Sequence, residues 1–508
     1  MKQAKVKTMM QEGGSDAIAL LLKFNDGEEE GIRLYMKELP LKKNEAYTVE
    51  IIDNGFEGEG IARIDGFTIF VPNAIKGETC EILIVKVLAS HGYGKLIRII
   101  NPSEQRVEPD CATYKRCGGC DLRHVKYEYT LELKKNAVQS LVNKGLKNKI
   151  QVSNTIGMNN PFYYRNKAQF PVGINEKGEP TVGVFAQRTH TIIPIKECLI
   201  QTQISQKIAN RIVEFIKENN FTVYNEQTQE GLFRHVVIKV GIKTNQVMCI
   251  LVLNEKDEIK EKYNSSNSKS ESEKLENLVE MLKQEFPEIK TIVKNINNKN
   301  TNVILGNKNI NLYGEGYIED ILGEYKFKIS PMSFYQVNPV QAEILYNTAI
   351  EAAQLSQEDT LFDLYCGIGT IGIFASKKVK QVYGIEIVEQ AIEDAKENAK
   401  INNVQNAEFI CGDVEFAFDE LINKKKITPT VIIVDPPRKG LDDKTIQNIL
   451  TLKIKKFVYV SCNPATMVRD IAKMEDEYEV QRIQPVDMFP FSKHVECVSV
   501  LHRKSLEK

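Results

Sequence analysis

The sequence contains no tryptophan, carries a net charge of only −1 and has no long apolar run. No run approaches the roughly 20 apolar residues that a membrane-spanning helix needs, and residues 1–16 lack the apolar centre of a signal peptide. We therefore expect no membrane association and no export, and a location in the cytoplasm. The near-zero charge argues against a wholly basic nucleic-acid-binding protein, although a local basic patch would suffice for contacts to phosphate.

The chain of 508 residues is too long for one hydrophobic core, and about three domains are expected. Its hydrophobic content of 42% and charged content of 27% are those of an ordinary globular protein. In the cytoplasm, its ten cysteines would be free thiols or metal ligands rather than disulfides.

Changes of composition divide the chain into four predicted parts. Residues 1–42 form an N-terminal extension with modest structure and no assigned function. Residues 43–102 combine short strands with glycine turns, which predicts a small OB-like β-barrel. Barrels of this kind often bind nucleic acid, but a structural barrel with a solvated basic rim fits the basic residues equally well. Residues 103–329 form a central α/β part, in which residues 263–273 are a predicted polar surface loop.

Residues 330–508 alternate between strands and helices, which is typical of an α/β doubly wound sheet. The apolar run at residues 458–464 (VYVSCNP) ends in Cys462, and Pro464 prevents the strand from continuing. Asp435 ends the preceding apolar run in the same way. In open α/β sheets, ligands bind beyond the carboxyl ends of the strands. A lone cysteine is more often an inert small hydrophobe, but this position exposes the thiol and favours a nucleophile.

A glycine-containing turn at residues 363–370 (DLYCGIGT) opens this part of the chain. Gly367 and Gly369 would leave backbone N–H groups free at a helix start, and Glu386 ends the next strand, where an acid can hold ribose hydroxyls. The turn lacks the full G-x-G-x-x-G pattern and is weak evidence alone. Together with Asp413 and Asp435, it predicts a site for a ligand that contains adenosine.

Glu496 lies near the start of the last apolar run, residues 494–501 (HVECVSVL). A carboxyl group beside a buried apolar site can have a raised pKa and act as a general base. We therefore predict that Glu496 works together with Cys462.

Three cysteines, Cys111, Cys117 and Cys120, lie close together in a C-x5-C-x2-C pattern. Such spacing in a cytoplasmic protein indicates a metal site rather than a disulfide. A fourth ligand is needed, and four thiolates suit either a [4Fe–4S] cluster or structural zinc.

Four motifs together resemble the RNA uracil-C5 methyltransferases: residues 334–339 (FYQVNP), 435–438 (DPPR), 461–464 (SCNP) and 494–496 (HVE). More narrowly, residues 44–505 resemble the bacterial 23S ribosomal RNA branch, whose members have a TRAM domain and an iron–sulfur cluster. The resemblance implies a Rossmann-like methyltransferase domain that uses S-adenosylmethionine (SAM), with Cys462 as nucleophile and Glu496 as base. It implies SAM binding by Gln336, Tyr365, Thr370, Glu386, Asp413 and Asp435. It also implies Cys198 as the fourth cysteine ligand, and it favours [4Fe–4S] over zinc.

The residues fit this chemistry independently. A thiolate that adds to C6 of uracil makes C5 nucleophilic, and a base must then remove the C5 proton. We expect 5-methyluridine formation in 23S ribosomal RNA, with no obligate protein partner implied, because related transfer RNA enzymes are expected to resemble only the catalytic half. The alternatives are a transfer RNA uracil-C5 methyltransferase and a non-catalytic ribosome assembly factor. Weaker candidates for RNA contacts are Arg165, Lys167 and Arg234.

Overall fold

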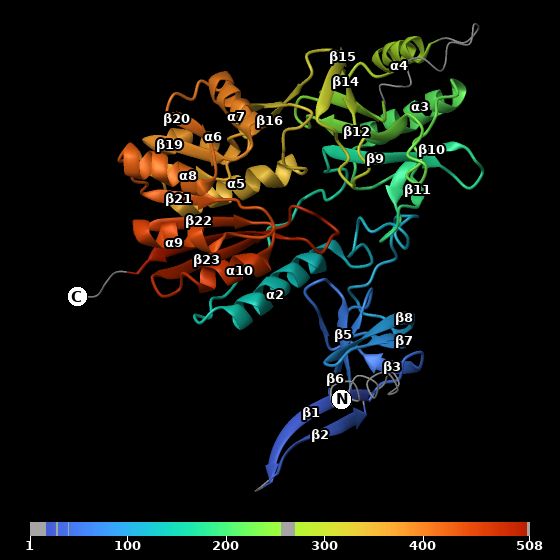
Figure 1. Ribbon diagram of the computed structural model, residues 1–508, viewed down its shortest axis with the longest axis vertical. Coiled ribbons are helices and arrows are strands. Elements are labelled where there is room, and N and C mark those ends of the chain that lie inside the picture. The colour runs from blue at the N-terminus through green and yellow to red at the C-terminus, as the bar shows by residue number, and fades with distance from the viewer. Residues whose placement is uncertain (1–16, 27–28, 39, 256–269, 505–508) are drawn as a thin grey trace. The chain divides into compact units, whose positions relative to one another are not determined.

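The computed structural model describes residues 17–26, 29–38, 40–255 and 270–504, and the side chains from residue 40 onward (Figure 1). The chain forms two compact units. The first comprises residues 1–110, 121–137 and 491–493, and the second comprises residues 111–120, 138–490 and 494–508. Within the described residues, no helix has both the length and the apolar character that crossing a membrane requires.

The first unit contains a two-stranded antiparallel pair, β1 and β2, and a six-stranded sheet in the order β3-β7-β8-β6-β5-β4. The pair lies in the predicted extension, where the ambiguous apolar pattern predicted only modest structure. In the sheet, alternate side chains point to one face and form a core around Ile69, Ile82 and Ile84. The strands are β1 (Ala17–Asp26), β2 (Glu29–Glu38), β3 (Ala46–Glu50), β4 (Asp53–Asn54), β5 (Gly60–Ile64), β6 (Phe67–Val71), β7 (Thr79–Val87) and β8 (His91–Asn101).

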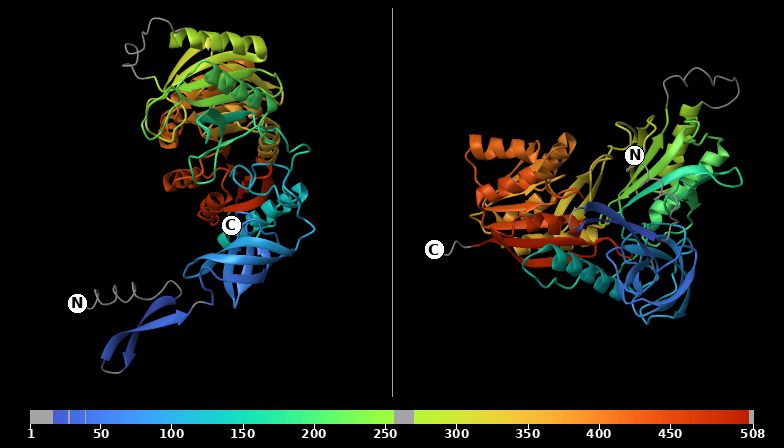
Figure 2. Two further views of the ribbon diagram at one scale, coloured as in Figure 1. Left: turned by 90° about the vertical axis from the view of Figure 1, so that its right-hand side faces the viewer. Right: turned by 60° about the horizontal axis from the view of Figure 1, so that its bottom comes forward.

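The second unit contains two seven-stranded sheets, the first in the order β11-β10-β9-β12-β13-β14-β15. All residues of β13 are buried: Cys249 and Leu251 pack on one face of the sheet, and Met248 and Ile250 pack on the other. The strands are β9 (Lys167–Ile174), β10 (Pro180–Phe185), β11 (Ile192–Pro194), β12 (Phe233–Val240), β13 (Val247–Leu253), β14 (Ile289–Ile296) and β15 (Lys308–Tyr313). Figure 2 shows this sheet with the helices α3 (Gln203–Glu218) and α4 (Glu271–Glu285) on one side.

The predicted surface loop at residues 263–273 is only partly described. Residues 263–269 lie outside the described residues, and Glu271 begins α4 after the N-cap Ser270, whose hydroxyl accepts a hydrogen bond from the Glu273 N–H. The polar composition of residues 271–273 therefore belongs to the first turn of a helix.

The second sheet of this unit has the order β20-β19-β18-β21-β22-β24-β23. Strands β18 to β22 run parallel, whereas β24 runs antiparallel to both β22 and β23. This arrangement confirms the predicted doubly wound α/β class and adds one antiparallel strand, β24, next to the edge strand β23. The strands are β18 (Thr360–Leu364), β19 (Gln381–Glu386), β20 (Ala407–Cys411), β21 (Val431–Val434), β22 (Lys456–Ser461), β23 (Tyr478–Val486) and β24 (Glu496–Arg503).

Helices cover both faces of this sheet (Figure 1), because its central strands are apolar on both sides. Val434 and Phe457 pack on one face, and Ile433 and Val458 pack on the other. The helices are α5 (Pro339–Ala353), α6 (Thr370–Ala375), α7 (Glu389–Ile401), α8 (Val414–Phe418), α9 (Asp443–Leu452) and α10 (Pro464–Ala472). Helix α2 (Tyr127–Gly145) begins in the first unit, and its residues Val138 and Val142, which belong to the second unit, pack in the core of this sheet. A separate antiparallel pair, β16 (Ile318–Leu322) and β17 (Tyr325–Ile329), precedes α5.

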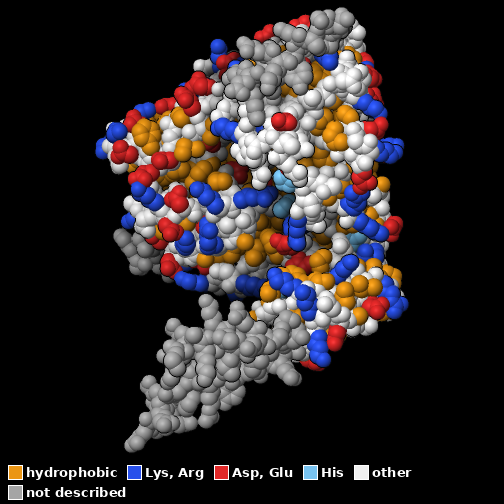
Figure 3. All heavy atoms as spheres, turned by 45° about the vertical axis from the view of Figure 1, so that its right-hand side comes forward, with side chains coloured by type: hydrophobic (Ala, Val, Ile, Leu, Met, Phe, Trp, Pro, Cys, Tyr) orange, Lys and Arg blue, Asp and Glu red, His pale blue; other side chains and the backbone are white. Residues whose placement is uncertain are grey.

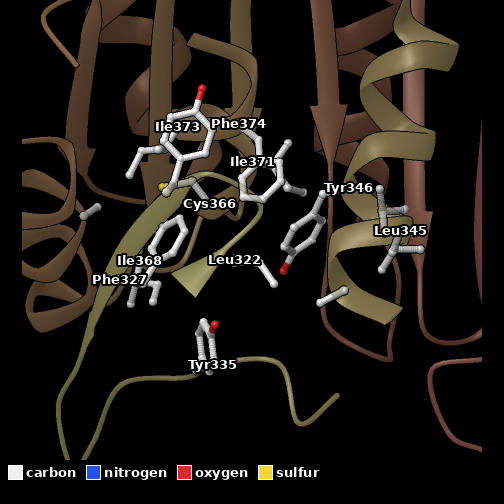
Figure 4. Packing of buried hydrophobic residues seen from close by; sticks show 14 of the residues in the cluster. Leu322, Phe327, Tyr335, Leu345, Tyr346, Cys366, Ile368, Ile371, Ile373 and Phe374 are labelled. Carbon is white, nitrogen blue, oxygen red and sulfur yellow. The ribbon is translucent and has the colours of Figure 1, made fainter. Parts of the chain in front are cut away.

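One hydrophobic cluster joins this pair, α5, α6 and the parallel sheet. Figure 4 shows Phe327 and Phe374 within it, and their rings stack at a centroid distance of 6.4 Å. Tyr346 and Cys366 of the same cluster also line the cavity described below. The wall of the cavity is therefore continuous with a packed core.

Candidate active site

A cavity of about 920 Å³ lies at the carboxyl ends of β18, β19, β21 and β22. All eight residues that the sequence predicts as catalytic or cofactor-binding line it: Gln336, Tyr365, Thr370, Glu386, Asp413, Asp435, Cys462 and Glu496. The site thus gathers residues separated by up to 160 positions along the chain. Its volume and its mixture of carboxylates and apolar surface fit a nucleoside-containing ligand such as SAM.

Cys462 lies in the turn between β22 and α10. The strand ends at Ser461, and Pro464 is the first residue of the helix, where its missing N–H costs nothing. The Asn463 side chain caps this helix and accepts a hydrogen bond from the Ala465 N–H at 3.2 Å. The local sequence therefore forces a sharp turn, which leaves the thiol half-buried at the cavity wall.

Glu496 begins β24, which runs antiparallel to β22 with Ser461 opposite Cys497. Cys462 directly follows Ser461 and Glu496 directly precedes Cys497, so both residues adjoin the same end of this strand pair. Both also line the cavity. Adjacent strands thus bring the candidate nucleophile and the candidate base together.

The cavity is electrostatically unfavourable for negative charge. Burial raises the pKa of the Cys462 thiol to about 11, and the nearby Glu496 and Asp435 carboxylates contribute to this increase, whereas Arg438 opposes it. Burial and Asp435 raise the pKa of Glu496 to about 8. Burial also raises the pKa of Asp435 to about 7. Perturbed groups that converge in one cavity are characteristic of catalytic sites.

The glycine-containing turn follows β18. Tyr365, Gly367 and Gly369 have φ values of 64°, 55° and 80°, and a Cβ atom on Gly369 would lie 2.8 Å from the Phe409 ring. The Gly367 N–H donates a hydrogen bond of 3.3 Å to one oxygen of Glu386, and the Val388 N–H donates one of 2.9 Å to the other. These contacts fix the Glu386 carboxylate at the cavity rim.

Asp413, which lines the cavity, is also the N-cap residue of α8. Its carboxylate caps α8 and accepts a hydrogen bond of 2.8 Å from the Phe416 N–H. The cap holds the carboxylate in place and leaves lone pairs for a ligand.

Several further residues line the cavity without having been predicted. Phe334 is 69% exposed, and Arg438 follows the two prolines after Asp435. Phe334 belongs to the motif at residues 334–339 and Arg438 to the motif at residues 435–438, so these motifs are the signal that could have identified them. Tyr346, Thr445 and Asn448 also line the cavity and stand in no motif.

The predicted metal ligands Cys111, Cys117, Cys120 and Cys198 are thiols rather than members of disulfides, and they lie in the second unit. Burial raises the pKa of Cys117, and the thiols of Cys198 and Cys111 raise it further, so these sulfurs influence one another. However, the described residues contain no group of three or more Cys, His, Asp or Glu side chains arranged to hold a metal ion. The donor type suits iron–sulfur or zinc, but within the described part of the chain the thiols are not arranged as a closed ligand set.

Arg234, which the sequence predicts as an RNA contact, has binding partners within the protein. Its side chain is buried, stacks on the Tyr224 ring at 4.3 Å and donates hydrogen bonds to the carbonyl groups of Asn297 and Lys299. Arg106, a basic residue just after the predicted barrel, pairs with the buried Glu78. On the face in Figure 3, lysine and arginine side chains are interspersed with acidic ones. Many basic residues therefore serve the fold itself.

Comparisons with known proteins agree with this site. Residues 126–504 match the tRNA (uracil-5-)-methyltransferase family model, and residues 40–97 match the TRAM domain model. An uncharacterized RNA methyltransferase of Clostridium acetobutylicum is 45% identical, with 92% of this chain and 99% of the relative covered. One of Staphylococcus aureus is 43% identical, with 91% and 99% covered.

A solved structure is also similar, that of the Pyrococcus abyssi tRNA (uracil-54, C5)-methyltransferase in complex with S-adenosyl-L-homocysteine. Its TM-score is 0.69 and its identity 28%, with 89% of this chain and 99% of that chain covered. The eight predicted residues around the cavity and the family match lead to the same conclusion. The chain belongs to the SAM-dependent RNA uracil-5-methyltransferase family and carries a TRAM domain.

Proposed function

We propose that the protein forms 5-methyluridine in 23S ribosomal RNA in the cytoplasm, with Cys462 as nucleophile and Glu496 as general base. The observation that carries this proposal is that Cys462 and Glu496 line one cavity, together with all six residues proposed to bind SAM. SAM, when bound, supplies the electrophilic methyl group that C5 of the uracil attacks.

The remaining chemistry belongs to the side chains. The Cys462 thiolate adds to C6, and the electron pair of the C5–C6 double bond moves toward the O4 carbonyl, which makes C5 nucleophilic. After methylation, the Glu496 carboxylate removes the proton from C5. The electrons of that C–H bond re-form the C5–C6 double bond, and the thiolate leaves. The enzyme is regenerated once Glu496 releases its proton.

The reaction requires C5 and C6 of the uracil to reach the cavity that Cys462 lines. A uracil within a helix would have to leave its stack, or the target would be in a loop. The exposed ring of Phe334 at the cavity suits a stacking contact with such a base. Removal of this ring should weaken RNA binding.

The choice of 23S ribosomal RNA rests on the resemblance of the motifs. The expectation that transfer RNA enzymes resemble only the catalytic half is wrong, because the Pyrococcus transfer RNA enzyme is similar over 89% of this chain. Transfer RNA is therefore the second candidate substrate. Mapping of 5-methyluridine in ribosomal and transfer RNA from cells with and without this protein separates the two.

A covalent trap tests the catalytic roles. RNA that contains 5-fluorouridine should form a stable, SAM-dependent adduct with the full-length protein, because the fluorine cannot leave as a proton. Peptide mapping should find the adduct on Cys462. The absence of an adduct with any cellular RNA would favour the non-catalytic assembly factor.

We further propose that Cys111, Cys117, Cys120 and Cys198 bind a [4Fe–4S] cluster, on the basis of their spacing, their thiol chemistry and the family resemblance. Protein purified without oxygen should be coloured and should contain iron and sulfide. Cys117→Ser should lose both. A colourless protein that contains zinc would contradict the iron–sulfur assignment.

A further inference from the structure

The cavity around Cys462 needs a source of positive charge. Its titratable carboxyl groups outnumber its cations: the carboxyl groups are Glu386, Asp413, Glu415, Asp435, Asp442 and Glu496, and the cations are Arg438, Lys439 and Lys444. A thiolate would form in this surrounding only if a cation opposed the carboxylates. Lys444 is already in an ion pair with Glu415.

The backbone of Arg438 is hydrogen-bonded to the segment that follows Cys462. Its carbonyl oxygen accepts a hydrogen bond of 3.0 Å from the Asn463 side-chain amide, and one of 3.3 Å from the Thr466 hydroxyl. Asn463 adjoins Cys462, and Thr466 lies in the first turn of α10. The backbone of Arg438 is therefore fixed relative to the thiol.

The loop beyond Arg438 is held by the same helix. The Arg469 guanidinium donates a hydrogen bond of 2.8 Å to the Lys439 carbonyl, and the Leu441 N–H donates one of 2.8 Å to Asp470. Asp470 is fully buried and also accepts a hydrogen bond from the Tyr459 hydroxyl. Four residues of one turn and helix, from Asn463 to Asp470, thus hold the loop that carries Arg438.

The electrostatics agree with this geometry. Arg438 is the cation that lowers the pKa of Cys462, against burial and the two carboxylates that raise it. It also lowers the pKa of Glu496, against burial and Asp435. Lys439 is not among the main influences on the pKa of either group. One guanidinium therefore favours the charged form of both groups.

We propose that Arg438 is a positioning residue that supplies the positive charge stabilising the Cys462 thiolate, and that α10 holds it there through Asn463 and Thr466. The proposal rests on the proposed function of Cys462. Only a proton moves in this step: the S–H bond breaks, the electron pair stays on sulfur, and the proton passes to solvent.

Alkylation of the full-length protein with iodoacetamide across a pH series tests this role without RNA or SAM. Peptide mass spectrometry follows Cys462 separately from the other nine cysteines. Arg438→Gln should slow alkylation of Cys462 at pH 8 by about tenfold, the effect of a pKa increase of one unit. Arg438→Lys should keep most of the wild-type rate. Lys439→Gln removes an adjacent cation of the same loop and should leave the pH profile unchanged.

An Arg438→Gln profile equal to that of the wild type would overturn the proposal, as would an equal effect of Lys439→Gln. Arg438→Met, which keeps an aliphatic stem, repeats the measurement if the glutamine variant does not fold. The RNA assay is separate. A wild-type protein that fails to methylate RNA but shows the Arg438 effect refutes the proposed function and leaves the thiolate stabilisation in place.

Discussion

The carboxyl group of Asp435 raises the pKa of Glu496 across the interior of one cavity. Asp435 follows β21 and Glu496 begins β24, with the strand of the nucleophile between them. Both carboxyl groups line the same cavity, so ionisation of one disfavours ionisation of the other.

Methyl transfer should increase with pH through about 8, because Glu496 must be ionised to act as base and its pKa is raised to about 8. The high pKa of Cys462 adds to the same trend. Asp435→Asn removes the like charge, so the acidic limb of the profile should move to lower pH by about one unit. Single-turnover rates at saturating SAM measure this shift. A limb that stays in place would show that Asp435 does not act on the base.

Glu496→Gln should abolish methyl transfer yet stabilise the protein. The pKa of Glu496 is higher in the folded state than its ordinary value of 4.5, so the folded protein binds more protons between pH 4.5 and 8. Stability therefore falls as pH rises through this window. A glutamine side chain does not ionise, so the variant avoids the free-energy cost of a buried charge. At pH 8 the melting temperature of the variant should exceed that of the wild type by about 2 °C or more. At pH 4 the difference should disappear.

Cys462→Ala should reduce methyl transfer by at least about 10³-fold and should abolish the 5-fluorouridine adduct. SAM binding, measured by calorimetry, should persist because the thiol is not among the residues proposed to hold the cofactor. Cys411→Ala is the matched control, since Cys411 is exposed and does not line the cavity. Substantial turnover by the Cys462 variant would refute the covalent mechanism.

The sequence could predict these side chains because the chemical signals are local. Cys462 and Asp435 end apolar runs, and strand ends of a parallel sheet meet at one edge. The sequence also predicts that Glu496 works together with Cys462, but it does not reveal how the two residues come together in space. Their proximity depends on the antiparallel direction of β24 and on its register, which are set by packing between strands far apart in sequence.

The partners of charged side chains could not be predicted from the sequence. The helix α3 (Gln203–Glu218) buries apolar residues at helical spacing, so a local pattern indicates it. Arg234 and Arg106 gave no such signal, because a basic side chain in a sequence reveals neither its partner nor its burial. Both are held by groups of their own unit, Arg234 by backbone carbonyls and Arg106 by Glu78. The prediction of RNA contacts from basic residues was least secure for this reason.

Arg234→Met should destabilise the protein rather than alter its RNA contacts. The change leaves the carbonyl groups of Asn297 and Lys299 without their donor, which costs about 1–3 kcal/mol. Denaturant unfolding should show this loss, whereas RNA affinity of the folded protein should stay within about twofold. Lys177→Met provides an exposed control of the same charge. A large loss of RNA affinity with unchanged stability would instead support a direct contact between Arg234 and RNA.

Gly440→Ala should damage the loop that carries Arg438. Gly440 has a φ of 78°, and a Cβ atom there would lie 2.4 Å from a carboxylate oxygen of Asp470. Gly178 has a φ of 77° in the same unit, and a Cβ atom there would meet no other atom within 4 Å, so Gly178→Ala bears only the backbone strain. That strain costs about 1 kcal/mol of folding stability, and Gly440→Ala should lower the stability by more than this. Gly440→Ala should also change the pH profile of Cys462 alkylation from that of the wild type. If the two variants behave alike, close packing against Asp470 does not hold the loop, and Arg438 must be positioned by the hydrogen bonds from Asn463 and Thr466 alone.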